Sequence, residues 1–195
     1  MAETILSSKP IASSEVPERA LLPTEGSNHV WTLPVPNPNE QNSALTYFVH
    51  AGDANDASLR VTMALLTQLL TEPAFNVLRT QEQLGYIVHC SQLVLARDTQ
   101  TGLKLVVQSE RAPAFLEERV EAFLGGMRTK IEEMPAEEFE AQKQGLARQW
   151  TEKVKNLREE TNRFWKYFEA GHLDFLRRES STAPHFWQPA DYLCL

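Results

Sequence analysis

The chain has 195 residues, of which 42% are hydrophobic and 23% charged, as is usual for one globular domain with a sizeable core. Its formal net charge is −7 at pH 7. This charge argues against nucleic acid and anionic membrane surfaces as partners, because binding phosphates requires clustered Lys and Arg. No apolar run approaches the roughly 18 residues that a membrane-spanning helix needs. The composition therefore predicts a soluble protein whose partners are neither nucleic acid nor membrane.

The N-terminal sequence and the cysteines indicate the compartment. Residues 1–20 lack the basic start and the apolar core of a signal peptide, and their Ser, Glu and Pro content predicts a disordered lead. The two cysteines, Cys90 and Cys194, lie far apart in the sequence, so we expect no disulfide framework. These features predict a cytoplasmic protein.

The first regular elements include a strand and a broad apolar helix. Residues 30–33 predict a short edge strand, because a proline follows and prevents its continuation. Residues 44–50 alternate in polarity and contain aromatic and β-branched side chains, which predicts a second strand. Residues 59–70 carry apolar side chains at steps of three and four and predict a mostly buried helix, with Asp56 or Ser58 as its N-cap.

Two further β-rich runs predict a hairpin. Residues 86–95 and 103–109 are joined by a short polar loop, residues 97–102, that contains a glycine. Such a pattern is typical of an antiparallel pair of strands. In the second of these strands every other residue is apolar, so we expect one face of the strand to lie in the core.

The C-terminal half predicts three helices. Residues 113–134 form an amphipathic stripe, and Pro135 begins a second helix that is mostly polar and therefore belongs on the outside. Residues 157–170 predict the third helix. The order of strands and helices indicates an α+β fold, a two-layer sandwich in which helices cover one face of an antiparallel sheet.

The residues taken one by one contain no self-sufficient catalytic site. None of the five histidines belongs to an H-E-x-x-H or H-x-x-E-H motif, so no helix brings two imidazoles to a metal ion. His89 and Cys90 are neighbours on a predicted strand and should point to opposite faces, which argues against a nucleophilic pair. The acidic residues between 132 and 140 are most simply a solvated helix surface.

The corner over residues 73–88 concentrates polar side chains between a helix and a strand. Its candidate residues are Asn76, Arg79, Glu82, Gln83, Gly85 and Tyr86. In one interpretation, which composition alone favours, Arg79 forms a salt bridge with Glu82 and Tyr86 fills space beside the helix. In the other, the guanidinium and the phenol donate hydrogen bonds to an extended peptide, and Gly85 leaves room for a backbone to approach.

Several segments of this chain together resemble one protein family. The strongest segments are residues 72–76 (EPAFN), 78–80 (LRT), 82–86 (EQLGY), 107–109 (VQS) and 118–124 (ERVEAFL), in this order along the chain. They are similar to the C-terminal lobe of the insulysin-type zinc metallopeptidases, in the pitrilysin family. The resemblance extends from about residue 21 to residue 177, and it implies one C-terminal-lobe domain over residues 21–178, followed by an irregular tail over residues 179–195.

The resemblance implies a substrate-binding role without catalysis. In the family, four similar domains form two lobes around a peptide chamber, and the first domain holds zinc through an H-x-x-E-H motif. The last domain contributes an Arg and a Tyr that hold the substrate backbone and stabilise the tetrahedral intermediate; by motif position these are Arg79 and Tyr86. Asn76, Glu82 and Gln83 support the motif together with Gly85. The implied partners are an N-terminal catalytic lobe, in cis or in trans, and an extended peptide, and zinc is expected in the intact enzyme.

The chain departs from the family pattern in two ways. It lacks the first three domains and their zinc motif, so we expect it to bind no metal and to be inactive alone. After about residue 178 the expected closing helix and strand are replaced by an unrelated tail, so we expect the sandwich to be incomplete at its C-terminus. Two alternatives remain open, a stand-alone peptide-binding or scaffold protein without hydrolytic activity and a truncated product without function.

Overall fold

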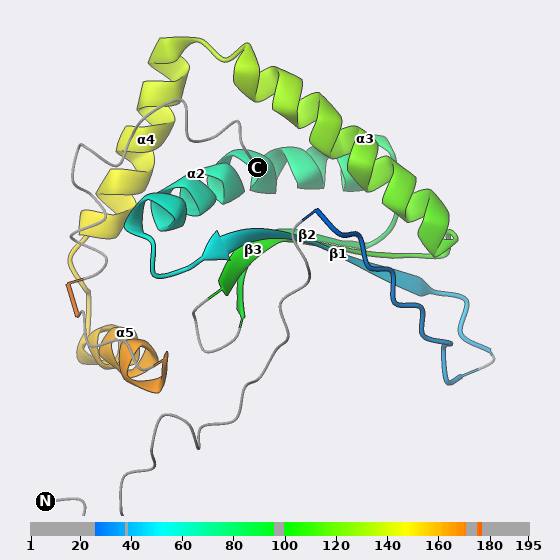
Figure 1. Ribbon diagram of the computed structural model, residues 1–195, viewed down its shortest axis with the longest axis horizontal. Helices are drawn as coiled ribbons and strands as arrows, with labels where there is room; N and C mark the ends of the chain where they lie inside the picture. The colour runs from blue at the N-terminus through cyan, green and yellow to red at the C-terminus, as the bar shows by residue number, and fades with distance from the viewer. Residues whose placement is uncertain (1–25, 38, 96–99, 171–174, 177–195) are drawn as a thin grey trace, which may run out of the picture. The chain divides into compact units, whose positions relative to one another are not determined.

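The computed structural model describes residues 26–37, 39–95, 100–170 and 175–176 (Figure 1). The chain divides into two units, residues 1–32 and residues 33–195, and each is described by itself. The predicted lead over residues 1–20 and the predicted tail over residues 179–195 lie outside the described residues.

The edge strand predicted over residues 30–33 is wrong. These residues adopt no regular secondary structure, and the sheet contains no strand that pairs with them. Strand propensity describes how well a side chain fits a pleated, half-buried surface, so it has little effect where no neighbouring strand accepts the backbone hydrogen bonds.

The sheet has three antiparallel strands, β1 (Ser43–Asp53), β2 (Ile87–Leu95) and β3 (Gln100–Ser109), in the order β1-β3-β2. The predicted hairpin is confirmed, because β2 pairs with β3 in antiparallel register. Val107 of β3 illustrates the register, since it lies opposite Leu45 of β1 on one side and Val88 of β2 on the other. Part of the predicted connecting loop, residues 96–99, lies outside the described residues.

Helix α2 (Ala57–Ala74) begins at the predicted cap. The Asp56 carboxylate accepts hydrogen bonds from the backbone N–H groups of Ser58, at 2.8 Å, and Leu59, at 3.4 Å. These bonds satisfy two of the amide groups that have no partner inside the first turn of a helix. Of the two N-caps that the sequence allowed, the structure selects Asp56.

The helix predicted over residues 59–70 extends further than expected and does not end before Pro73. It runs through this proline and continues directly as η2 (Phe75–Gln81), a π-helix. A proline inside a helix removes one backbone hydrogen bond and costs about 3 kcal/mol. Ala74 and Leu78, just beyond it, are fully buried in the core, and their burial offsets that cost. Packing that depends on the whole domain therefore overrides the local stop signal.

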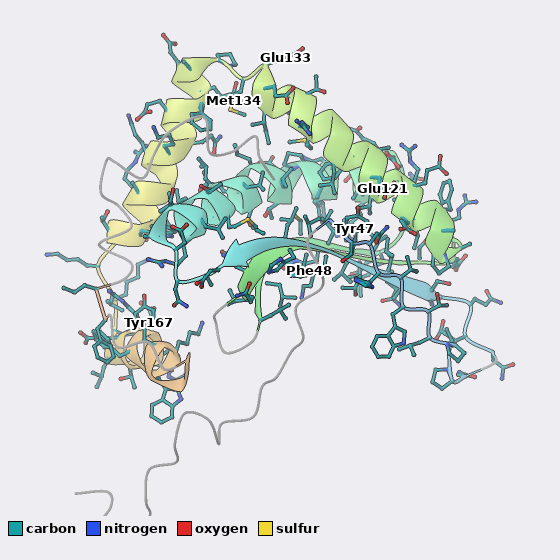
Figure 2. All side chains as sticks on the ribbon, in the orientation of Figure 1. Tyr47, Phe48, Glu121, Glu133, Met134 and Tyr167 are labelled. Atoms are coloured by element: carbon teal, nitrogen blue, oxygen red, sulfur yellow. The ribbon has the colours of Figure 1, made fainter. Side chains whose placement is uncertain are left out.

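Helices α2 and α3 (Pro113–Glu132) lie over the same face of the sheet, which confirms the predicted two-layer α+β sandwich (Figure 1). The main core is formed by apolar side chains from α2, α3, η2 and the sheet. Its fully buried members include Met63, Leu78, Leu105, Val107, Leu116 and Val120. At the edge of this core, Tyr47 of β1 points toward Glu121 of α3 and donates a hydrogen bond of 3.4 Å to it (Figure 2).

Helix α4 (Ala136–Thr151) covers a second face of α2. Leu146 of α4 is buried against Val61, Leu65 and Leu69, while the other residues of α4 are exposed or half-buried, which agrees with the predicted position of this helix on the outside. Helix α2 is therefore apolar on two sides, toward the sheet and toward α4, which explains its unusually broad apolar surface. The last helix, α5 (Leu157–Ala170), is close to the predicted range. No helix of the described residues is long and apolar enough to cross a membrane.

Candidate functional site: the corner between η2 and β2

The backbone reverses direction sharply between η2 and β2. The N–H of Glu82 donates to the carbonyl of Val77 at 2.9 Å, and the N–H of Leu84 donates to the carbonyl of Leu78 at 3.0 Å. Between them Gln83 has a φ of 51°, in the left-handed region that costs a non-glycine residue roughly 1–2 kcal/mol. Because Leu78 and Leu84 are both buried, core packing compensates for this strain and holds the corner in one conformation.

Gly85 is required by a close approach of two backbone segments. A Cβ atom at this position would lie 1.8 Å from the carbonyl oxygen of Gln108 in β3. Ser109 strengthens the same contact, because its buried hydroxyl donates to the carbonyl of Leu84 and accepts from the N–H of Arg111 at 3.0 Å. The space that we expected Gly85 to leave for a backbone is thus occupied by β3 of the chain itself.

Arg79 lies against two aromatic rings. Its Cζ atom is 4.6 Å from the ring centroid of Phe75 and 4.8 Å from that of Tyr86. At such distances a guanidinium is attracted to the π-electron face of a ring, which fixes its orientation and leaves its N–H groups available. Tyr86 is 81% exposed, so it does not fill space in the core.

Glu82 binds a residue far away in the sequence. Arg119 of α3 donates from Nε and from Nη2 to the two carboxylate oxygens of Glu82, both at 2.8 Å. The hydrogen bond and the charge of Glu82 raise the pKa of Arg119. The bidentate pair joins the corner to α3, and it replaces the salt bridge between Arg79 and Glu82 that composition favoured. Within the described residues Arg79 forms no ion pair with any carboxylate.

Asn76 and Gln83 are exposed at the same corner, and neither side chain makes a hydrogen bond to another described residue. Beside them a polar hollow of about 650 Å³ opens where β3 ends and β1 and β2 begin. Its walls include Tyr86, Gln108 and Arg111. Hydroxyl, amide and guanidinium groups are well suited to the N–H and C=O groups of a peptide backbone.

The described residues provide no metal site. No group of three or more His, Cys, Asp or Glu side chains in this part of the chain is arranged to hold a metal ion. Cys90 is buried on β2, and burial raises the pKa of its thiol to about 11, so it is protonated at neutral pH. His89 is exposed, as expected for strand neighbours that point to opposite faces. Within the described residues, Cys90 and His89 therefore do not form a zinc site.

Comparison with known proteins places this domain in a class. Residues 65–165, just over half of the chain, match the family described as PQQ synthase PqqF-like, C-terminal lobe domain 4. The chain is 39% identical over 131 residues to the insulin-degrading enzyme of Homo sapiens, which covers 67% of the chain and 13% of that protein. It is 30% identical over 173 residues to "Insulin-degrading enzyme-like 1, peroxisomal" of Arabidopsis thaliana, covering 88% of the chain and 17% of that relative.

The solved structure of pitrilysin has the same fold. It superimposes with a TM-score of 0.66 at 28% sequence identity, over 80% of this chain and 16% of pitrilysin. The corner and the fold are thus those of a C-terminal-lobe domain. The chain belongs to the insulysin/pitrilysin family of zinc proteases. It spans less than a fifth of the length of each of these relatives.

Sequence reasoning found most of the corner but missed Arg119. The motif residues Asn76, Arg79 and Tyr86 are all exposed or half-buried at the corner, where a ligand can reach them. Arg119 is 37 residues from Glu82, and no periodicity links the two positions. The available signal was that both residues lie in segments that resemble the same family.

Proposed function

We propose that this chain is a substrate-binding, non-catalytic domain of a zinc metalloendopeptidase, and that it binds extended peptides through Arg79 and Tyr86. The observation that carries the proposal is the state of the Arg79 guanidinium, which is stacked on two rings and pairs with no described carboxylate. A guanidinium and a phenol are rigid donors, and the carbonyl groups of an extended peptide are acceptors that otherwise bind water. The polar hollow beside Tyr86 extends this donor surface.

Hydrolysis requires groups that the described residues do not supply. We propose that the intact enzyme holds zinc in an N-terminal lobe, which joins this domain in cis or in trans. When bound there, zinc supplies the Lewis acid for peptide cleavage. The contribution of this domain is to hold the peptide backbone in an extended conformation with Arg79 and Tyr86. We also propose a cytoplasmic location, on the basis of the cysteine content.

Peptide affinity tests the binding role directly. Fluorescence anisotropy with a labelled insulin B chain should show binding to the wild-type chain, and Arg79→Ala should weaken it by about 10- to 100-fold, because hydrogen bonds to charged groups are the stronger ones. Tyr86→Phe removes a single neutral hydrogen bond and should weaken binding by about 2- to 10-fold. Arg128→Ala is the matched control, since this arginine is exposed on α3 and pairs with Glu132 of the same helix. Equal affinity of Arg79→Ala and the wild type would disprove the role.

Complementation separates this function from the alternative of a stand-alone peptide-binding or scaffold protein. Human insulin-degrading enzyme that lacks the region matched by this chain is mixed with the chain, and cleavage of the B chain is followed. A domain of a metalloendopeptidase should restore cleavage, and Arg79→Ala should reduce the gain. The stand-alone alternative predicts peptide binding without any gain in cleavage. The observation in its favour is that the contacts of Arg79 with Tyr86 and of Arg119 with Glu82 are both made within this one chain.

A further inference from the structure

Glu82 binds one arginine, Arg119, and lies close in the sequence to another, Arg79. Arg119 holds both of its carboxylate oxygens at 2.8 Å. Arg79 lies in η2, and Glu82, the C-cap of η2, follows it by only three residues. In the structure Arg79 lies instead against Phe75 and Tyr86. The carboxylate nearest to Arg79 in sequence is therefore fully engaged by another helix.

We propose that Arg119 is a positioning residue that keeps Arg79 free for substrate by occupying Glu82. This inference rests on the proposed function of Arg79. When Arg119 is absent, the Glu82 carboxylate has lost the charged partner that held both of its oxygens and is free to bind the Arg79 guanidinium. That ion pair would draw Arg79 away from the aromatic rings and use the N–H groups that a peptide carbonyl needs. Arg119 thus acts on substrate binding through Glu82, without touching the substrate.

The geometry favours this competition. Arg119 binds both oxygens of the Glu82 carboxylate and neutralises its charge, which weakens the attraction of Glu82 for a second guanidinium. Its side chain is 21% exposed and that of Arg119 is 34% exposed, so both are partly shielded from water and salt. Arg119 is itself placed by the core, because its neighbour Val120 and Leu116, one turn earlier on α3, are fully buried.

Two single variants break the same salt bridge with different consequences. Arg119→Ala leaves a free carboxylate three residues from Arg79, whereas Glu82→Gln leaves none. If the salt bridge only stabilises the corner, both variants should weaken peptide binding alike. If Arg119 protects Arg79 from Glu82, Arg119→Ala should weaken peptide binding more than Glu82→Gln does. An exposed ion pair between Arg79 and Glu82 would lower the affinity by about 1.5- to 5-fold.

The experiment measures affinity for the labelled insulin B chain and the urea midpoint of unfolding for each variant. We expect Arg119→Ala to bind about 1.5- to 5-fold more weakly than the wild type. Glu82→Gln and the double variant Glu82→Gln/Arg119→Ala should bind more tightly than Arg119→Ala, although all three variants should be less stable than the wild type. Glu132→Gln, which breaks another salt bridge of α3, is the control for stability.

The double variant decides the outcome. Recovery of affinity in Glu82→Gln/Arg119→Ala, without recovery of stability, supports the protection of Arg79. Affinity that stays as low as in Arg119→Ala, or that falls equally in Glu82→Gln, overturns it. If Arg79→Ala has no effect on affinity, the proposed function fails. If Arg79→Ala weakens binding while Arg119→Ala does not, the proposed function stands and only the role of Arg119 is lost.

Discussion

Replacing Gly85 with alanine tests how the corner is built. The added Cβ would lie 1.8 Å from the carbonyl oxygen of Gln108 and 2.8 Å from its carbonyl carbon. A carbon and a carbonyl oxygen normally stay about 3.3 Å apart, so the corner and β3 would have to separate by about 1.5 Å. Neither backbone moves freely, because Gln108 lies in the central strand, opposite Ala44 of β1 and Ile87 of β2.

The cost of Gly85→Ala follows from these contacts. Overpacking at a rigid site costs about 1–3 kcal/mol, and loss of the hydrogen bond from Ser109 to Leu84 adds about 1 kcal/mol. We therefore expect the free energy of unfolding to fall by about 2–4 kcal/mol. Urea denaturation followed by circular dichroism measures this change. The midpoints can be compared directly when both proteins have the same m-value, the slope of the unfolding free energy against urea concentration.

Gly126→Ala is the matched control for this substitution. Gly126 lies within α3, and a Cβ added there would meet no atom within 4 Å. Alanine should stabilise this helix position by about 0.5–1 kcal/mol, because glycine loses more backbone entropy on folding. The same chemical change should therefore have opposite signs at the two positions. A Gly85→Ala variant as stable as the wild type would refute the proposed contact with β3.

Three further predictions concern the core and two titrating groups. Leu116→Ala, in the core, should lower the free energy of unfolding by about 2–5 kcal/mol, and Leu157→Ala, 78% exposed, should change it by less than about 0.5 kcal/mol in the same urea assay; equal effects would contradict the packing. Because burial raises the pKa of Cys90 from 9.0 to about 11, its stabilising contribution is present below pH 9 and is lost as the pH rises toward 11. Iodoacetamide at pH 8.5 should label the Cys90 peptide only after unfolding, as mass spectrometry would show; rapid labelling of the native chain would oppose this. Burial and then the charge of Glu121 raise the pKa of Tyr47, so Glu121→Gln should lower that pKa without restoring its ordinary value in an ultraviolet titration, whereas no change would argue against the contact.

Much of the fold was predictable because its signals are local. The antiparallel hairpin of β2 and β3 follows from two β-rich runs joined by a polar loop. The start of α2 follows from Asp56, whose carboxylate reaches amide groups only two and three residues away. The apolar stripe of α3 corresponds to the buried residues Leu116 and Val120 and their helical repeats. In each case the residues that determine the structure are close neighbours in the chain.

The candidate site was predicted only in part. Family resemblance identified Arg79 and Tyr86, and the structure shows that Tyr86 is exposed and that Arg79 stacks on its ring. The expected salt bridge between Arg79 and Glu82 was wrong, because local spacing could not account for a competitor on another helix. The role of Gly85 was also incomplete, because the backbone that approaches it belongs to β3.

The amino-acid sequence by itself determined most of the helices and strands of the sandwich, the absence of an H-x-x-E-H zinc motif, and the family to which the chain belongs. Only the tertiary structure decided that α2 continues through Pro73 into η2, that Gly85 contacts Gln108, and that Glu82 binds Arg119. The physical reason is distance along the chain. Hydrogen bonds and caps act over a few residues, whereas core burial and the Glu82–Arg119 salt bridge arise between segments that only folding brings together.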